Sequence, residues 1–124
     1  MPLIDPDRSA LLVIDLQARL MPAIDQSDLR LANAARLAGD TALVVCGCEA
    51  HVCVLQTVLG LRATGRQVFV VADAVGSRIE ANRKAGLARM QAHGAEIVTT
   101  EMVIFEWLGS AAHPAFKTLM PLIK

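Results

Sequence analysis

The sequence contains few aromatic residues, only 3% of its 124 positions, and no tyrosine. Its core must therefore be built from aliphatic side chains, which the 54% of hydrophobic residues can supply. Cores rich in valine, leucine, isoleucine and alanine are typical of a parallel sheet that helices cover on both faces. We therefore expect an α/β protein.

The chain also lacks an excess of charge, because 12 Lys and Arg balance 12 Asp and Glu. Nucleic acids and anionic membranes attract basic surfaces, which this balance does not favour. No apolar run reaches the roughly 20 residues of a membrane span, and the first residues lack the basic and apolar segments of a signal peptide. We expect no nucleic acid or membrane partner, and a cytoplasmic location.

Cysteines are few, and all three lie close together, at Cys46, Cys48 and Cys53. An odd and clustered set is not typical of a disulfide framework and fits a reducing compartment better. Together with His51 these cysteines could form a compact metal cluster. Structural zinc sites usually draw their ligands from two separated pairs, however, so we expect no metal and no other cofactor.

Four short runs of branched apolar residues predict buried parallel strands. The runs lie at residues 10–14, 42–46, 68–72 and 96–99. Helical patterns alternate with them, at residues 28–38, 53–64, 77–93 and 100–107, and a last short helix begins at Pro114. This alternation predicts a three-layer α/β/α fold with a Rossmann-like parallel sheet, shortened to about four strands. No linker divides residues 1–124, so we expect a single domain.

Local signals define several helix ends. Ser77 and Glu80 fit an S-x-x-E capping box, which predicts that Ser77 is the N-cap of the helix at residues 77–93. Gly65 and Gly94 follow helical patterns where a left-handed residue commonly ends a helix.

The most informative stretch follows the second predicted strand, where Gly47 ends the strand and Cys53 lies near the beginning of a helix. The first amides of a helix favour an anion, so a thiol there should ionise more easily than a buried one. The alternative is that Cys53 is a small core residue. Asp15 and Asp73 also end predicted strands, and ligands of open parallel sheets bind at this edge, which favours a nucleophile.

Three motifs resemble the isochorismatase-like cysteine hydrolase superfamily: I-D-L-Q at residues 14–17, G-C-E-A-H-V-C-V-L-Q-T at 47–57 and D-A-V-G-S-R at 73–78. The similarity continues through residues 99–106 and 113–117, so it covers nearly the whole chain. Within the superfamily, the chain resembles the branch of isochorismatase domain-containing proteins. The resemblance implies a hydrolase that attacks a small amide or ester-like substrate and forms a thioester. It also implies a homo-oligomer.

The resemblance assigns roles to individual residues. It implies that Cys53 is the nucleophile and that Asp15 takes the thiol proton, which fits the chemistry because only a thiolate attacks. It implies that the backbone amides of Glu49 and Cys53 form the oxyanion hole. It further implies a cis peptide bond between Cys48 and Glu49.

Other polar residues are expected to be structural. In D-A-V-G-S-R the resemblance implies architecture, with Gly76 in a permissive turn and Arg78 paired with a carboxylate. Asp73 is expected to have a structural role as well. His51 is expected to lie in a turn or to line a pocket, rather than to act as a ligand or a base.

The sequence departs from the family at one place. Family members carry several dozen residues between the first helix and the cysteine strand, including two strands, the substrate-covering loops and the catalytic lysine. Here residues 38–41 join the two directly, so we expect an internal deletion near them. The lysines present, Lys84, Lys117 and Lys124, match non-catalytic positions.

This departure leaves alternatives open. Either the first helix has moved to the other face of the sheet, or the section exists in the molecule outside this sequence. Without the two family strands, the first strand becomes an edge that invites pairing with another chain. The chain could be an active hydrolase, a catalytically impaired shortened variant that acts as a scaffold or oligomerisation protein, or a redox-sensitive thiol protein.

Overall fold

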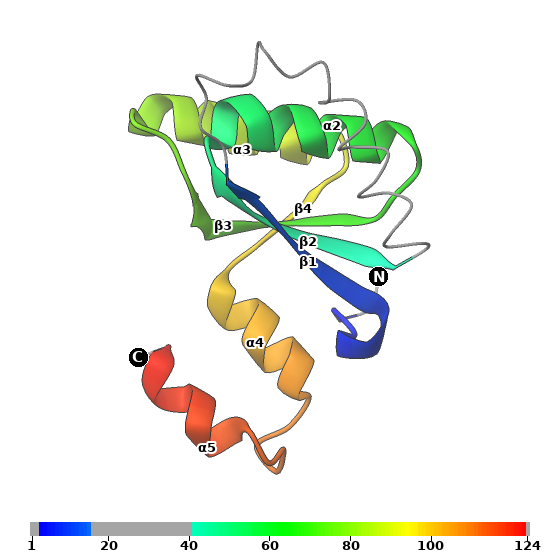
Figure 1. Ribbon diagram of the computed structural model, residues 1–124, viewed down its shortest axis with the longest axis vertical. Helices are drawn as coiled ribbons and strands as arrows, with labels where there is room; N and C mark the ends of the chain where they lie inside the picture. Colours follow the sequence, from blue (N-terminus) through cyan, green and yellow to red (C-terminus); the bar gives the residue numbers. More distant parts are fainter. Residues whose placement is uncertain (1–2, 16–40, 124) are drawn as a thin grey trace.

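The computed structural model describes residues 3–15 and 41–123. Four parallel strands form one sheet in the order β1-β2-β3-β4, with helices on both faces (Figure 1). The strands are β1 (Ser9–Asp15), β2 (Ala42–Cys48), β3 (Val68–Gly76) and β4 (Glu96–Val98). The predicted α/β/α architecture with four parallel strands is confirmed.

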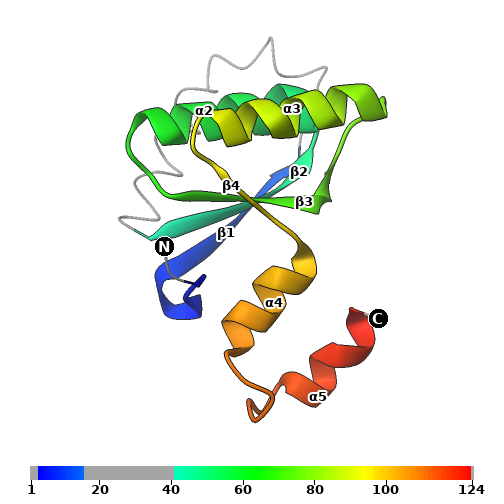
Figure 2. The same ribbon diagram turned by 180° about the vertical axis from the view of Figure 1, so that it is seen from behind.

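The helices divide between the two faces of the sheet. They are the 3-10 turn η1 (Pro6–Arg8), the π-helical turn η3 (Ala50–Val54), α2 (Leu55–Ala63), α3 (Glu80–Ala92), α4 (Thr100–Leu108), α5 (Phe116–Leu119) and the 3-10 turn η4 (Met120–Leu122). Helices α2 and α3 lie side by side on one face, and α4 lies on the other (Figures 1 and 2). The crossovers through α2 and α3 step in the same direction across the sheet, so right-handed connections put both helices on one face.

The alternation of side chains along the strands builds two cores. Val45 and Val70 belong to the core under α2 and α3, whereas their neighbours Val44 and Phe69 belong to the core under α4. Each of these four side chains is at most 2% exposed. Both faces of β2 and β3 are thus buried, which explains their nearly continuous apolar sequences.

Strand β3 is longer than the predicted strand at residues 68–72. It leaves its register with β2 between Val70 and Val75, an interval over which β2 advances only from Val45 to Gly47. Residue Asp73 therefore lies within an irregular part of the strand and not at its end. The apolar run gave no signal for this continuation, because Ala72 is half-buried, and Asp73 and Ala74 are exposed.

Helix α3 begins at Glu80, later than the capping box predicts. Ile79 occupies the N-cap position without a side-chain hydrogen bond, and the predicted role of Ser77 as N-cap is wrong. From the first turn of α3, Arg83 donates hydrogen bonds to the carbonyl oxygens of Ala72 and Val75. The helix thereby satisfies backbone groups that the irregular part of β3 leaves available.

Other predicted ends are close to the observed ones. Gly65 and Gly94 have φ angles of 83° and 94°, as expected of left-handed residues after a helix. Helix α4 begins at Thr100 with Thr99 as its N-cap, and the last helix begins at Phe116 rather than at Pro114. The predicted helix at residues 28–38 lies outside the described residues, as does most of the junction at 38–41.

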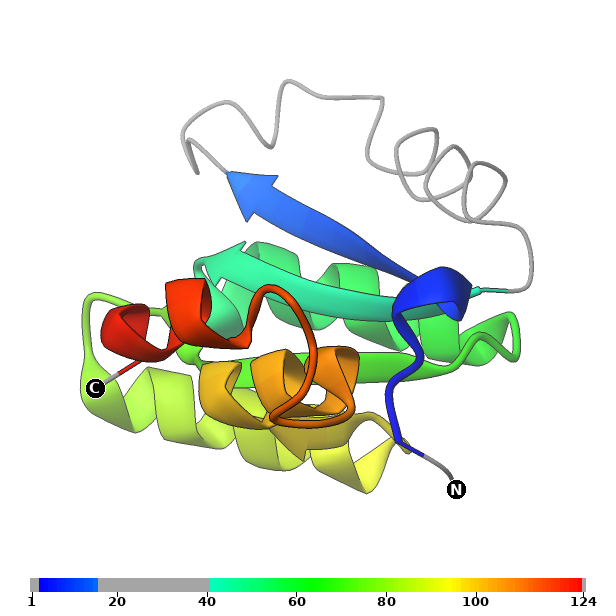
Figure 3. The ribbon, with the colours of Figure 1, turned by 90° about the horizontal axis from the view of Figure 1, so that it is seen from below.

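Seen from below, α4 and α5 lie in front of the sheet, and α2 and α3 lie behind it (Figure 3). Strand β1 is an edge of the described sheet. None of the helices within residues 3–15 and 41–123 combines the length and the apolar character needed to cross a membrane.

Candidate active site

The candidate site lies where β1 and β2 end. Asp15, the last residue of β1, is the register partner of Cys48, the last residue of β2. Turn η3 begins shortly after Cys48 and carries Cys53 as its fourth residue. The fold therefore brings the backbone of the predicted proton acceptor beside the turn that holds the predicted nucleophile.

The Cys53 thiol is buried, with 2% of the residue exposed. Burial is the main cause that raises the pKa of this thiol above its usual value, and the nearby Glu49 carboxylate raises it further. The expectation that Cys53 ionises easily is therefore not met. The position of Cys53 near the beginning of a helical turn does not expose it, because its side chain belongs to the core under α2 and α3.

One contact opposes these effects. The backbone N–H of Glu49 donates a hydrogen bond to the Cys53 thiol, which favours the thiolate and lowers the pKa of Cys53. The peptide bond between Cys48 and Glu49 is cis, as the resemblance implies. The Glu49 carbonyl oxygen accepts hydrogen bonds from the N–H groups of Val52 and Val54, both at 3.2 Å. Glu49 is thus joined to the cysteine turn through both of its backbone polar groups.

The Glu49 side chain points to another partner, Arg78. Its Oε1 atom accepts hydrogen bonds from the backbone N–H of Arg78 at 3.2 Å and from Nε at 3.1 Å. These contacts lower the pKa of the Glu49 carboxyl, and the hydrogen bond from the backbone N–H of Arg78 has the largest effect. The Glu49 side chain is 15% exposed and that of Arg78 is 86% exposed. The predicted pairing of Arg78 with a carboxylate is confirmed.

A second contact joins the same two segments. The Ser77 hydroxyl lies 2.8 Å from Nδ1 of His51, a half-buried residue of η3. Helix α3 also packs tightly on this turn, because a Cβ atom at Gly86 would lie 2.9 Å from the Cα of His51 and 3.0 Å from the oxygen of Ala50. His51 therefore has a structural role in the turn, as expected.

Sequence reasoning missed the contribution of Gly86. A glycine in the middle of a helical pattern was the available signal, since a residue that weakens a helix commonly has a packing reason.

The other two cysteines differ in environment. Cys48 is exposed, whereas Cys46 is half-buried against the core under α4. Burial and then the neighbouring Cys48 thiol raise the pKa of Cys46. Among the residues that the structure describes, no three His, Cys, Asp or Glu side chains are placed to hold a metal ion.

Asp73 lies apart from the thiol site. Its Oδ1 atom accepts hydrogen bonds from the backbone N–H of Thr100 at 2.8 Å and from the Thr100 hydroxyl at 2.9 Å. These contacts satisfy donors in the first turn of α4. The expectation of a structural rather than catalytic role for Asp73 fits this arrangement.

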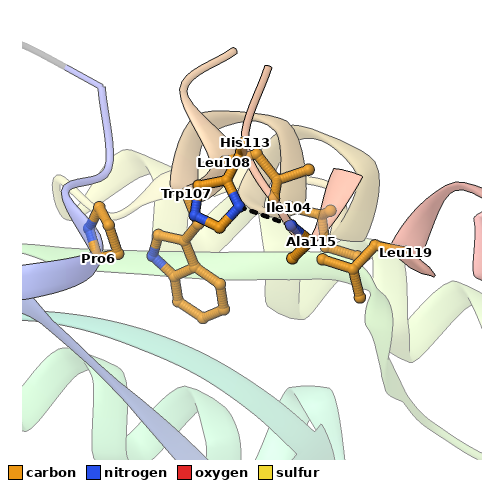
Figure 4. A pocket seen from close by; sticks show the side chains of 7 residues that line it. All are labelled: Pro6, Ile104, Trp107, Leu108, His113, Ala115 and Leu119. Carbon is orange, nitrogen blue, oxygen red and sulfur yellow. Dashed lines mark hydrogen bonds between the residues drawn. The ribbon is translucent and has the colours of Figure 1, made fainter. Parts of the chain in front are cut away.

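A separate cavity of about 240 Å³ lies between η1, α4 and α5 (Figure 4). It is lined by Pro6, Ile104, Trp107, Leu108, His113, Ala115 and Leu119. Nδ1 of His113 accepts a hydrogen bond from the backbone N–H of Ala115 at 3.0 Å. None of the predicted site residues lines this cavity.

The fold and the turn define an α/β protein with a buried cysteine at the carboxyl edge of a parallel sheet. The isochorismatase domain family matches residues 27–102, more than half of the chain. The chain therefore belongs to the isochorismatase family, and the resemblance found in its motifs is confirmed.

Similar proteins support this assignment. Isochorismatase domain-containing protein 2 of Homo sapiens is 45% identical over 82 residues, which cover 66% of this chain and 40% of the human protein. The curated relatives are thus much longer than the segment that matches them.

Solved structures share the fold. A structure of MAR1 ribonuclease from Caenorhabditis elegans has a TM-score of 0.73 and 29% identity, and covers 98% of this chain and 92% of that one. An octameric YcaC hydrolase of unknown specificity from Escherichia coli has a TM-score of 0.62 and 28% identity, over 73% of this chain and 51% of that one.

Proposed function

We propose that this protein is a cysteine hydrolase that acts on a small amide or ester-like substrate through a thioester. Cys53 is the nucleophile, Asp15 takes its proton, and the backbone N–H groups of Glu49 and Cys53 bind the oxyanion. The observation that carries the proposal is that Asp15 and Cys48 end neighbouring strands next to the turn that holds Cys53, with the Glu49 N–H directed at the thiol. A hydrogen-bond donor beside the nucleophilic sulfur is well placed to bind the oxygen of the carbonyl group that the sulfur attacks.

The proposed reaction has two halves. The Cys53 sulfur attacks the carbonyl carbon, Asp15 takes the thiol proton, and the oxygen becomes an oxyanion. The oxyanion collapses, the bond to the amine or alcohol breaks, and Asp15 returns the proton to the leaving group. Water then attacks the thioester carbonyl, and Asp15 takes a proton from the water. The bond between the carbonyl carbon and the Cys53 sulfur breaks, Asp15 returns the proton to the sulfur, and the acid leaves.

A base is needed because burial raises the pKa of Cys53, so the resting group at neutral pH is the thiol. The lysine that the family resemblance implies has no counterpart in this sequence, so a full triad is not part of the proposal. A catalytically impaired variant that acts as a scaffold is therefore the second candidate.

The geometry gives less support to a redox-sensitive thiol. Sensor cysteines usually have a low pKa and are accessible, whereas Cys53 is 2% exposed and has a raised pKa. An oxidant would first meet Cys48, which is exposed.

The similar Caenorhabditis elegans protein is named as a ribonuclease. This chain has no excess of basic residues to neutralise an RNA backbone. We therefore keep the small-molecule substrate as the proposal and include RNA as a comparison substrate in its test.

Association into a homo-oligomer is part of the proposal. On edge strand β1, Leu11 and Val13 are 56% and 60% exposed, which is unusual for a sheet face. The related YcaC hydrolase from Escherichia coli is an octamer. Light scattering should give a mass larger than that of one chain, and Leu11→Asp should lower it; a monomer would contradict this part.

Hydrolysis of a panel of small amides and esters tests the main proposal. Activity should disappear in Cys53→Ala and fall about a hundredfold or more in Asp15→Asn, because a general base contributes about that much. Cys46→Ala is the matched control and should retain activity. The acyl group should appear as added mass on the peptide that contains Cys53.

Two outcomes would contradict the proposal. Hydrolysis that survives Cys53→Ala would exclude Cys53 as the nucleophile. A wild-type protein that cleaves RNA but no amide or ester would exclude the substrate class.

A further inference from the structure

We propose that Arg78 is a positioning residue of the candidate active site, which acts on the Cys53 thiol by holding and neutralising the Glu49 carboxylate. The inference rests on the proposed role of Cys53. It concerns a residue outside the nucleophile, the base and the oxyanion donors.

Glu49 affects the thiol in two opposite ways. Its backbone N–H donates to the sulfur and favours the thiolate, while its carboxylate is a negative charge that disfavours it. Both groups belong to one residue, so a turn that places the Glu49 N–H at the Cys53 thiol also places the Glu49 carboxylate near that thiol. A positive charge beside the carboxylate would offset its unfavourable effect on the thiolate.

Arg78 supplies that charge at the right place. Its Nε lies 3.1 Å from Oε1 of Glu49, and its backbone N–H donates to the same oxygen at 3.2 Å. The Glu49 side chain is 15% exposed, so water screens its charge less than that of an exposed residue. The adjacent Ser77 holds His51 of the same turn, so the loop fixes the position of Glu49 as well as its charge.

Asp15, at the end of β1, is the proposed acceptor of the thiol proton and is the same in every variant compared below. The other charged and titratable groups of the neighbouring described elements have other contacts or lie at the surface. On α3, Arg83 pairs with Glu80 at 2.9 Å and bonds carbonyl oxygens of β3. Cys48 ends β2 and is exposed, and His51 bonds Ser77. Among the described groups, the Glu49 carboxylate is the charge that raises the pKa of Cys53, after burial.

Titration of the single thiol in a Cys46→Ser, Cys48→Ser protein tests the inference. Thiolate absorbs ultraviolet light, and the chain contains no tyrosine whose ionisation would interfere. At a fixed pH, Arg78→Gln should lower the thiolate fraction about twofold to fivefold, the range of a partly screened ion pair. Glu49→Gln should raise the fraction, and Arg78→Lys should stay close to the parent.

The decisive variant combines both changes. If Arg78 acts through Glu49, Arg78→Gln should have no further effect in the Glu49→Gln protein. Arg89→Gln makes the same change in net charge at an exposed position of α3 and should leave the titration unchanged.

If the serine variants do not fold, the alkylation rate of Cys53 in the wild-type background replaces the titration, with each cysteine followed in its own peptide by mass spectrometry. An equal effect of Arg78→Gln with and without the Glu49 carboxylate would overturn the inference, as would no effect or faster alkylation of all three thiols. None of these readouts requires turnover. An inactive protein with the expected order of titrations would therefore overturn the proposed function alone.

Discussion

The hydroxyl oxygen of Ser77 lies 2.8 Å from Nδ1 of His51, and this contact joins the loop before α3 to the turn that carries Cys53. The sequence pattern predicts a different use for the same hydroxyl, as the N-cap of α3. The two uses have different consequences for stability, because a cap acts within one helix whereas this contact joins two segments.

Ser77→Ala should lower the free energy of unfolding by about 0.5–1.5 kcal/mol, the usual net value of one hydrogen bond. Chemical denaturation of Ser77→Ala, His51→Ala and the double variant measures it. The double variant should lose less than the sum of the single losses, because both substitutions remove the same bond. Strict additivity would instead indicate that Ser77 acts without His51.

Gly86→Ala should destabilise the protein although alanine is the better helix former. The added Cβ would lie 2.9 Å from the Cα of His51, a backbone atom that cannot rotate away. Overpacking of this kind costs about 1–3 kcal/mol, more than the roughly 1 kcal/mol of helix propensity that alanine gains.

Thermal or urea unfolding checks the sign of the Gly86 effect. Ala88→Gly, at an exposed position of the same helix, is the control and should cost about 1 kcal/mol from propensity alone. An increase in stability in Gly86→Ala would show that α3 does not press on η3.

The sequence predicted the sheet well because its signals are local. The apolar runs of β2 and β3 are continuous where both faces are buried, and Gly65 and Gly94 mark turns that require a positive φ. Both features depend on residues that are close together in the sequence, so apolar runs and glycines are enough to predict them.

The environment of Cys53 was not predictable in the same way. The choice between an exposed helix start and a buried turn depends on α3, whose Gly86 allows it to cover η3. The irregular part of β3 likewise depends on Arg83, which bonds its carbonyl oxygens from another element. Contacts between distant segments decide both, and no local pattern encodes them.

Gly47→Ala should prevent stable folding, with a loss of more than about 3 kcal/mol. Gly47 has a φ of 123°, and a Cβ there would lie 1.9 Å from the carbonyl oxygen of Ile14, on the neighbouring strand β1. Both the backbone conformation and the pairing of β1 with β2 would have to change.

Gly65→Ala separates these two causes. Its φ of 83° is also positive, but a Cβ there would meet no atom within 4 Å. We expect a loss of only about 1–2 kcal/mol, the cost of a left-handed conformation. Circular dichroism and denaturation of both variants test the comparison, and equal losses would refute the steric argument at Gly47.

Stability should fall as the pH rises through the range in which cysteine ionises. Burial raises the pKa values of Cys53 and Cys46 in the folded state. Below the usual cysteine pKa of about 8.5, both states hold these protons and the pH has no effect through them. Above this pKa the thiols of the unfolded chain lose their protons first, and this ionisation stabilises the unfolded state. The free energy of unfolding therefore decreases until the thiols of the folded state ionise as well.

Urea unfolding between about pH 7 and pH 10 measures this slope in the wild type, Cys53→Ala and Cys46→Ala. Each substitution should lower the stability near neutral pH, because it removes a buried or half-buried side chain, but should flatten the decline above about pH 8.5. The absence of tyrosine removes another group that would titrate in this range. A decline as steep in both single variants as in the wild type would mean that neither thiol is its source.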